Sequence, residues 1–428
     1  MIRDAPDADL LIHSVDRLYT CRGPAPRRGA AQRDAGLIEN AAIAAFGGVI
    51  VALGPNQEVH GRVRLTAGAS VVSAAGHTVV PGLVDPHTHL VFVGDRRDEL
   101  QRRLGGATYA EIAADGGGII RTVRATRDAS EQELVDTALP RLAAMLACGT
   151  TTVEIKSGYG LDTASELRML RAIRTLAARQ PIEIAPTFMG AHEIPVEYRE
   201  RRAEYVRLVV DDMIPAVAAE TLAEWCDVFC EHGVFTPEET RTILEAGRHH
   251  GLAPRVHADE LALSGGSAVA AEIGARSADH LIFVDAAHAK LLAERGVVAT
   301  LLPSAAFFLK LGRFAPARML IDAEVPVALA TDMNPGGGFS PSMPFVMTLA
   351  AFAMNMTLEE ALVGATLNAA ASLDRADRVG SLEIGKQMDA AIIQGTLADL
   401  IRVGEPVVRA VIKRGRHVAG LEWTNAIR

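Results

Sequence analysis

The sequence predicts a (β/α)8 TIM barrel together with a small β-sandwich domain that is built from both chain ends. Three observations support this fold class. The 428 residues accommodate a barrel of roughly 250–330 residues and a modest second domain. Through the middle of the chain, short apolar runs alternate with capped amphipathic segments, as parallel β/α units do. Both ends instead carry short apolar runs broken by turn residues, a pattern typical of β hairpins.

The two chain ends are expected to share one β domain. Residues 42–46 and 49–54 form apolar runs around Gly47-Gly48, and residues 380–393 place a turn before a short apolar strand. We therefore expect residues 1–78 to form the N-terminal part of the β domain. Residues 79–375 are expected to form the barrel, and residues 376–428 the C-terminal part of the β domain.

Eight barrel strands are expected, each followed by a helix or loop. They cover residues 79–89, 151–155, 182–187, 227–230, 254–257, 277–281, 297–302 and 325–331. Ser130, Thr236 and Thr357 each precede a glutamate by three residues, which predicts helix N-caps. An open doubly wound sheet is the alternative fold, but no Gly-x-Gly-x-x-Gly turn follows the first strand.

Charge and composition argue against several classes of protein. The formal net charge of -9 disfavours broad nucleic-acid binding, and no stretch approaches the ~18 uninterrupted apolar residues of a membrane span. Residues 1–10 have neither the basic flank nor the hydrophobic run of a signal peptide. Four scattered cysteines are too few for a disulfide framework. We expect a soluble, cytoplasmic protein that binds neither nucleic acid nor membrane.

Histidine and aspartate side chains fall at the ends of several expected strands. His87 and His89 end the first, His257 the fifth, His280 lies in the sixth, and Asp332 follows the eighth. These ends open onto one face of a barrel, and residues two apart in a strand point the same way. Three neutral imidazoles and one carboxylate suit zinc or ferrous iron and leave a position open for water. The sequence thus predicts a metal site.

A metal site of this kind points to hydrolysis, because a bound divalent ion lowers the pKa of water from ~15.7 toward ~7. Hydrolysis also needs a group that moves protons, often a carboxylate. Glu260, three residues past His257, is the candidate, and Asp259 is expected to point elsewhere. The alternative is that both carboxylates open the next helix. Whether Glu260 or Asp332 takes the first proton stays open.

The segment Pro81-Gly-Leu-Val-Asp-Pro-His-Thr-His89 resembles the first-strand motif of the amidohydrolase superfamily. More narrowly, and almost end to end, the chain resembles the imidazolonepropionase family. The matching segments are His87-Thr-His-Leu-Val-Phe-Val-Gly-Asp-Arg96, Glu154-Ile-Lys-Ser-Gly-Tyr159-Gly-Leu-Asp, Thr187-Phe-Met-Gly-Ala-His192-Glu, His257-Ala-Asp-Glu260, Ala278-Asp-His280-Leu and Thr331-Asp332-Met-Asn334-Pro-Gly336.

This resemblance implies hydrolytic ring opening of 4-imidazolone-5-propanoate to N-formimidoyl-L-glutamate in histidine degradation. It implies one Zn or Fe ion per subunit on His87, His89, His257 and Asp332, and a homodimer is expected by family and base rate. The catalytic residues that we infer are Glu260, His280 and Asp332. The substrate or product contacts that we infer are Arg96, Tyr159, His192, Glu260, Asn334, Gly336 and Gly337.

The residue types agree with these roles. A planar guanidinium such as Arg96 suits the carboxylate of a propionate, and Tyr159, in a glycine-flanked turn, could cover a heterocycle or anchor its own loop. Lys156 follows the second strand, whereas the modified lysine that bridges two metals in some amidohydrolases belongs on the fourth, so one metal is expected. Gly337 departs from relatives, which typically carry Ser or Thr there.

Two other functions compete with this prediction. An aminohydrolase of the same fold, acting on a nucleobase or a similar ring, would release ammonia. A non-catalytic assembly protein on a degenerate barrel predicts gaps in the metal-ligand set, and the sequence contains the full set.

Overall fold

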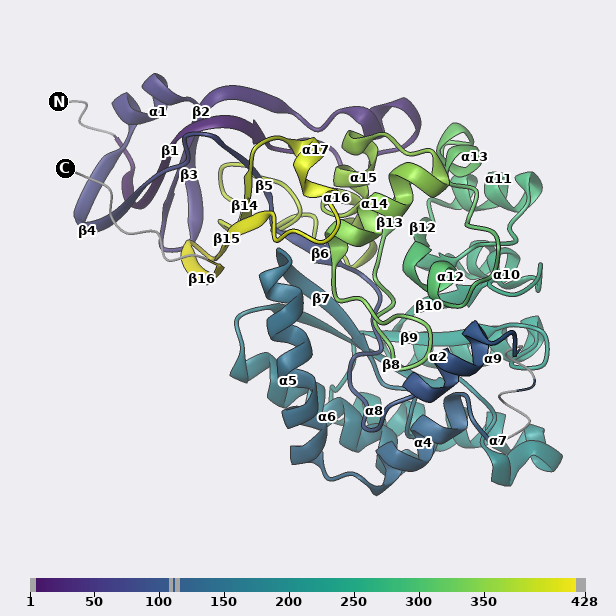
Figure 1. Cartoon of the computed structure of the whole chain (residues 1–428). Coiled ribbons are helices and arrows are strands. Elements are labelled where there is room, and N and C mark those ends of the chain that lie inside the picture. The colour runs from purple at the N-terminus through teal and green to yellow at the C-terminus, as the bar shows by residue number, and fades with distance from the viewer. Residues whose placement is uncertain (1–4, 108–110, 112–115, 421–428) are drawn as a thin grey trace.

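Two β-sheets organise the protein, and our computed structural model describes residues 5–107, 111 and 116–420 of it. One sheet is a parallel barrel and the other is a mixed sheet formed by both chain ends (Figure 1). The mixed sheet lies at the upper left of Figure 1, on the side where both termini are found. A β/α barrel with an attached β domain is therefore confirmed. Residues 1–4 and 421–428 of the expected end parts lie outside the described residues.

The barrel sheet contains eight parallel strands, each paired with the next along the chain. They are β6 (Leu83–Asp85), β7 (Thr150–Lys156), β8 (Glu183–Ala191), β9 (Trp225–Cys230), β10 (Ala253–Ala258), β11 (Ser277–His280), β12 (Val298–Leu301) and β13 (Val327–Leu329). A bridge between Thr88 and Met333 joins the chain beyond β6 to the chain beyond β13. The first and last strands thus meet just past their carboxyl ends.

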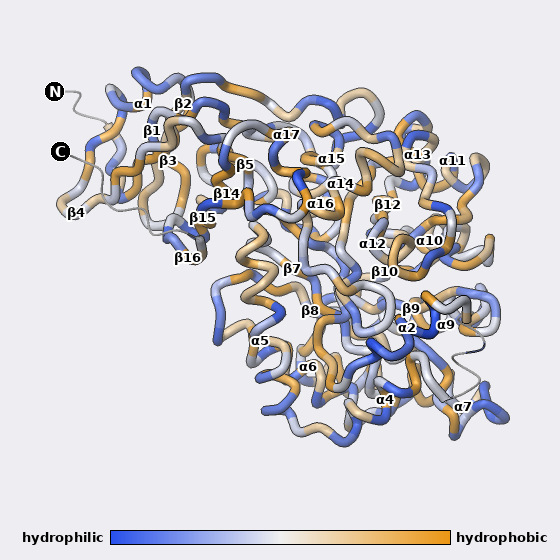
Figure 2. The backbone as a smooth tube through the Cα atoms, in the orientation of Figure 1, coloured by the Kyte–Doolittle hydropathy of each residue, from blue (hydrophilic) through white to orange (hydrophobic). Residues whose placement is uncertain are grey.

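Helices follow the strands and pack their apolar faces against the barrel in one large hydrophobic cluster. Figure 2 shows hydrophobic residues concentrated inside the molecule and hydrophilic ones along its outer loops. The helical elements are α2 (Arg97–Leu104), α4 (Ile119–Asp128), α5 (Glu131–Ala147), α6 (Thr163–Arg179), η2 (Val196–Arg201), α7 (Arg202–Leu208), η3 (Val209–Met213), α8 (Ile214–Ala219), α9 (Pro237–His249), α10 (Gly266–Ile273), α11 (Ala286–Arg295), α12 (Pro303–Phe308), α13 (Ala317–Asp322), α14 (Met343–Met354), α15 (Leu358–Gly364) and α16 (Leu367–Ser372).

The three predicted helix caps are confirmed. The hydroxyls of Ser130, Thr236 and Thr357 each accept the backbone N–H of the glutamate three residues on, at 3.2 Å. At Thr236 and Thr357 the carboxylate of the glutamate also accepts the backbone N–H of the cap residue. Each cap satisfies N–H groups that the first helical turn leaves without partners.

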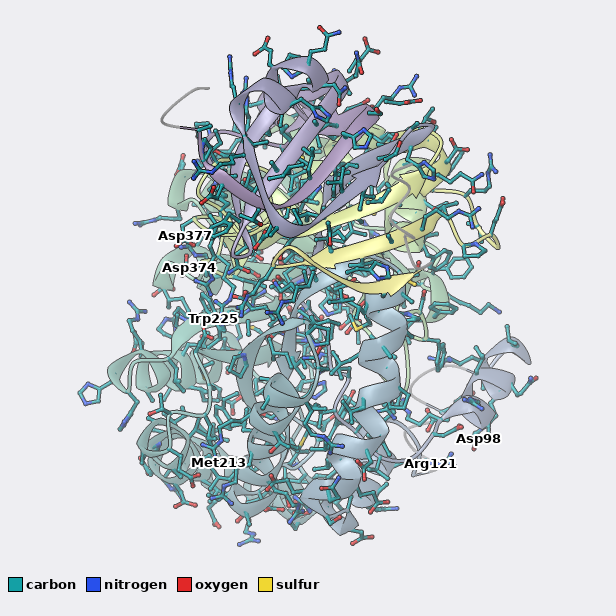
Figure 3. The ribbon with its side chains drawn as sticks, turned by 90° about the vertical axis from the view of Figure 1, so that its left-hand side faces the viewer. Asp98, Arg121, Met213, Trp225, Asp374 and Asp377 are labelled. Carbon is teal, nitrogen blue, oxygen red and sulfur yellow. The ribbon has the colours of Figure 1, made fainter. Side chains whose placement is uncertain are left out.

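Helix α2 projects from the carboxyl-end side of the barrel (Figure 3). Asp98 on this helix pairs with Arg121 of α4 at 2.6 Å, and Figure 3 shows the two side chains together at the right of the view. The N-cap of α2 is Arg96. This arrangement places a predicted substrate residue at the start of a tethered helix.

The end domain is hydrogen-bonded as one mixed sheet, in the order β16-β15-β14-β5-β1-β2-β3, with β4 also paired to β1. Its strands are β1 (Asp7–Tyr19), β2 (Leu37–Phe46), β3 (Val49–Pro55), β4 (Arg64–Ser73), β5 (His77–Pro81), β14 (Ala390–Gln394), β15 (Val408–Lys413) and β16 (Arg416–Gly420), joined by η1 (Gly29–Arg33), α1 (Asn56–Arg62) and α17 (Leu397–Leu400). Ile50 of β3 and Ile412 of β15 share one core. Because these strands lie far apart in the sheet order, the sheet curls over that core, as in a sandwich.

The first expected barrel strand, residues 79–89, is wrong in its bounds. Residues 77–81 are β5 of the end domain, and the barrel strand β6 covers only residues 83–85. Gly82 separates them where the chain passes close to the next strand, because a Cβ at this position would lie 2.2 Å from Oγ1 of Thr151. His87 and His89 therefore lie beyond the strand, on either side of the bridged Thr88.

The structure also bears on membrane insertion. Among the described residues, no helix is both long enough and apolar enough to cross a membrane.

Candidate metal centre

A cavity of about 400 Å³ lies at the carboxyl ends of the barrel strands, and each strand contributes to its lining through its last residues or through the segment that follows it. His89, His257, His280 and Asp332 line it together with Glu260. The expected convergence of these residues is thus observed, because the carboxyl ends of parallel strands open on one face of the barrel.

Four predicted ligands come together at the base of this cavity. Nε2 of His89 lies 3.2 Å from Nε2 of His257. Oδ1 of Asp332 lies 3.6 Å from Nε2 of His87 and 3.7 Å from Nε2 of His89. His87, His89 and Asp332 each offer one atom within 4.8 Å of the others, a spacing that suits a shared metal ion.

Two aspartates orient two of the histidines. Nδ1 of His87 lies 2.6 Å from Oδ2 of Asp279, and Nδ1 of His257 lies 3.1 Å from Oδ1 of Asp227. A carboxylate only accepts, so each imidazole carries its proton on Nδ1 and turns an unprotonated Nε2 toward the cavity. Nε2 of His87 is buried and has no hydrogen-bond partner among the described residues. A metal ion would satisfy this nitrogen, so the donor set fits the metal ion that the sequence predicts.

Burial favours the neutral form of the His87 and His89 imidazoles, the form in which histidine binds a metal. Burial, and then the nearby cationic and imidazole groups, lowers the pKa of His87 and His89 well below the usual range. Burial also raises the pKa of Asp332 to about 8. A cation placed beside Asp332 would favour its ionised form.

Glu260 faces the cavity and is separate from the ligand cluster. Its Oε1 lies 3.6 Å from Nδ1 of His280. Burial, followed by the charges of Asp332 and Glu231, raises the pKa of Glu260 well above 4.5. Backbone N–H groups of Leu261 and Ala262 donate to Oε2 of Glu231, which holds the segment just after Glu260.

Asp259 points away from the cavity and has a structural role. Its carboxylate accepts bonds from the backbone N–H groups of Ser264 and Gly265 and from the hydroxyl of Ser267. The next helix begins at Gly266 with Gly265 as its N-cap. Neither Asp259 nor Glu260 therefore lies in its first turn, and the alternative that both open this helix is wrong.

Arg96, Tyr159 and His192 also line the cavity. Nε of Arg96 donates to Glu99 at 2.8 Å. The His192 ring stacks on the His89 ring with centroids 4.7 Å apart, and the Tyr159 ring lies 5.3 Å from that of His192. Nδ1 of His192 lies 3.0 Å from the carbonyl oxygen of Gly158, which fixes the orientation of the ring.

The loop that follows Asp332 is organised by Asn334. Its Nδ2 donates to the Asp332 carbonyl, and its Oδ1 accepts the N–H groups of Gly336 and Gly337 at 2.8 and 2.6 Å. A Cβ at Gly336 would lie 2.4 Å from Nη1 of Arg96. The amide of Asn334 thus serves its own loop, and Gly336 leaves room for the guanidinium.

Sequence reasoning missed the groups that lie behind the ligands. Asp227 and Asp279, which orient the histidines, lie in fully buried strands. Lys156 donates to Glu154 at 2.9 Å and to Asp227 at 2.8 Å, so its nitrogen is already paired. The available signal was a charged residue inside an otherwise apolar run, as at Asp227 between Cys226 and Val228.

Comparison with known proteins agrees with this geometry. The model of the amidohydrolase family matches residues 78–418. The chain is 52% identical to the imidazolonepropionase of Symbiobacterium thermophilum, over 95% of this chain and 96% of that protein. It is 47% identical to the imidazolonepropionase of Geobacillus thermodenitrificans, over 96% of this chain and 97% of that one.

Solved structures share the architecture. An adenosine deaminase from Xanthomonas campestris with bound zinc has a TM-score of 0.72 at 20% identity, covering 99% of this chain and 96% of that one. Atrazine chlorohydrolase from Arthrobacter aurescens, complexed with zinc, has a TM-score of 0.72 at 18% identity, covering 96% and 95%. At these identities the likeness concerns the fold alone.

The barrel and its buried cluster of imidazoles and carboxylate, taken with these matches, define a metal-dependent hydrolase. The chain belongs to the amidohydrolase family, and the relatives that match it over nearly their whole length are imidazolonepropionases.

Proposed function

We propose that this chain hydrolyses 4-imidazolone-5-propanoate to N-formimidoyl-L-glutamate, a ring-opening step of histidine degradation. The observation that carries the proposal is the 52% identity to an imidazolonepropionase over 95% of the chain. The site supports it, because one cavity brings together the histidine ligands, the carboxyl group of Glu260 and the guanidinium of Arg96.

One divalent ion, Zn or Fe, is proposed per subunit, held by His87, His89, His257 and Asp332. Nitrogen and oxygen donors of this kind suit either metal. An ion at this point is also supported by Nε2 of His87, which has no hydrogen-bond partner in the part of the chain that the structure describes. When bound, such an ion lowers the pKa of water from ~15.7 toward ~7 and polarises a carbonyl.

Glu260 is assigned the proton transfers. Water adds to the ring carbonyl carbon, the C–N bond to that carbon breaks, and the leaving nitrogen gains a proton. Glu260 takes a proton from the water and returns one to that nitrogen, which is general acid–base catalysis. His280 lies 3.6 Å from Glu260 and assists from that position. Asp332 is the competing first acceptor.

The remaining lining residues are assigned to the substrate and product. Arg96 pairs with the propionate carboxylate, while Tyr159 and His192 cover the heterocycle. Because the amide of Asn334 bonds within its own loop, this loop, including Gly336 and Gly337, meets the product through its backbone. At Gly337 the backbone replaces the hydroxyl that relatives typically supply.

The assay uses purified, metal-loaded protein and freshly prepared 4-imidazolone-5-propanoate. We expect substrate loss far faster than the spontaneous decay, without release of ammonia. A rate equal to spontaneous decay would overturn the proposal. Ammonia release from a nucleobase or a similar ring would identify an aminohydrolase instead.

Three further points are proposed. The proposed domain division keeps the expected bounds of residues 1–78, 79–375 and 376–428 except at the first junction, which moves to residue 82, because β5 (His77–Pro81) pairs with β1 and β14 of the end sheet. The enzyme acts in the cytoplasm, where its four free cysteines fit a reducing environment. It forms a homodimer, the commonest symmetric assembly.

A further inference from the structure

Among the fully buried ionisable side chains of the barrel strands, five form ion pairs with one another. They are Glu154, Lys156, Asp227, Arg255 and Asp279. Burying charges is costly even when they are paired, and apolar residues of similar volume would often serve stability as well. None of the five lines the cavity, so none touches the substrate. Their retention in the interior calls for a function other than substrate binding.

Lys156 fixes the aspartate that orients His257. Nζ of Lys156 donates to Oδ2 of Asp227 at 2.8 Å. The other oxygen, Oδ1, accepts the His257 backbone N–H at 3.2 Å and lies 3.1 Å from Nδ1 of the same residue. With both oxygens engaged, the carboxylate cannot rotate without breaking a bond. The plane of the His257 imidazole is thereby set from behind.

Arg255 similarly fixes Asp279, the aspartate that orients His87. Its Nη2 lies 3.3 Å from Oδ2 of Asp279, the oxygen that faces Nδ1 of His87 at 2.6 Å. The guanidinium is itself anchored, because Nη2 also donates to the carbonyl of Pro86 and Nη1 donates to that of Ser372. The arginine therefore holds both the aspartate and the backbone next to His87.

Glu154 connects Lys156 to the histidine pair. Oε1 of Glu154 accepts from Lys156 at 2.9 Å, and Oε2 accepts the backbone N–H of Thr88 at 3.1 Å. Thr88 lies between His87 and His89 in the sequence. By contrast, Nδ1 of His89 has no hydrogen-bond partner among the described residues. The buried charged groups thus orient the side chains of two of the three ligand histidines, His87 and His257.

We propose that Lys156 and Arg255 are positioning residues for metal binding, each holding the aspartate that orients one ligand histidine. This inference rests on the metal site proposed above. Such outer partners typically change metal affinity by 10- to 100-fold when they are removed. A purely structural role would instead lower stability and leave the metal affinity of the folded protein unchanged.

The test compares Lys156→Met with a matched control, Lys413→Met. Lys413 is another buried lysine between two carboxylates, 2.7 Å from Asp389 and 3.7 Å from Glu183, but it lies in the end domain. Metal-free protein is titrated with zinc against a chromogenic chelator, and unfolding temperatures are recorded with and without zinc. Neither measurement requires the substrate, so failure of the proposed reaction would not affect the outcome.

We expect Lys156→Met to weaken zinc binding by about 10- to 100-fold and to reduce the rise in unfolding temperature that zinc produces. Lys413→Met should lower the unfolding temperature of the metal-free protein while its zinc affinity stays within about two-fold of the parent. Equal zinc affinities in the two variants, whether both are unchanged or both are weakened, would overturn the inference. If Lys156→Met does not fold, Lys156→Met with Glu154→Gln, which removes one charge of each sign, takes its place under the same two criteria.

Discussion

Glu260→Gln is the substitution that most directly separates proton transfer from metal binding. Glutamine has nearly the shape of glutamate, so the change leaves no cavity at a residue that is only 8% exposed. Two sets of side chains lie close enough to share an ion, namely His87, His89 and Asp332, and His87, His257 and His280. Glu260 belongs to neither set. We therefore expect the variant to fold, to retain the metal and to lose its acid–base function.

The expected magnitude follows from the chemistry that is removed. General acid–base catalysis contributes about 10²- to 10⁴-fold, or about 2.7 to 5.4 kcal/mol in the activation free energy. Among the described residues, the basic group within salt-bridge distance of Glu260 is the imidazole of His280, at 3.6 Å. Because burial lowers the pKa of His280 well below its usual range, this ring is a poor substitute as the proton acceptor. A loss of at least about 100-fold in kcat is expected.

The assay measures kcat on freshly prepared substrate and the metal content of the same sample. Asp332→Asn provides the contrast, since it alters a proposed ligand and should lose metal and activity together. Retention of turnover within about ten-fold in Glu260→Gln would refute the assignment of proton transfer to this residue. Loss of metal from Glu260→Gln would refute its separation from the ligand set.

Three further predictions concern Arg96, the glycines of the loop after Asp332 and the helix cap at Thr357. The variant Arg96→Met should keep its metal and lower kcat/KM by roughly 10- to 150-fold, because hydrogen bonds to charged groups are worth ~1.5–3 kcal/mol. An unchanged kcat/KM would exclude Arg96 from binding the substrate carboxylate. Gly336→Ala should also lower kcat/KM, because its Cβ would lie 2.4 Å from Nη1 of Arg96. At Gly337, the nearest atoms to an added Cβ belong to the Leu309 side chain, at 3.1 Å and beyond, so Gly337→Ser should affect kcat/KM less. Equal kinetics for these two glycine variants would contradict this steric explanation. The variant Thr357→Ala removes one capping box and should lower the free energy of unfolding by about 1 kcal/mol with kcat unchanged. Denaturant titration measures this free energy. If the variant is as stable as the parent protein, the cap contributes nothing to stability.

The fold was predictable wherever local chemistry determines it. The caps at Ser130, Thr236 and Thr357 were read from a hydroxyl and a glutamate three residues apart, because capping involves one turn of chain. The break at Gly82 was not predictable in this way. It depends on the close approach of Thr151, which lies 69 positions further along the chain, and we interpreted residues 79–89 as one strand although Pro81 and Gly82 interrupt its apolar residues.

In the site, too, local patterns were predictable and long-range contacts were not. His87, His89, His257 and Asp332 were recognisable because strand ends meet on one face of a barrel. The contact of Asp279 with His87 crosses the barrel interior between residues 192 positions apart, and no local pattern specifies which histidine a buried aspartate will face. The resemblance implied a substrate contact for Asn334, but it did not indicate that both ends of this amide form hydrogen bonds within its own loop.

The metal ligands also belong to the seam that closes the barrel. The backbone N–H of Asp332 donates to the carbonyl of His87 at 3.1 Å, and that of His89 donates to the carbonyl of Met333 at 2.9 Å. These bonds join the segments that follow the first and last barrel strands, while β6 and β13 themselves pair with β7 and β12. An ion bound by His87, His89 and Asp332 would link the same two segments through their side chains. Because a ligand that binds only the folded state stabilises it, metal binding and closure of the barrel should favour each other.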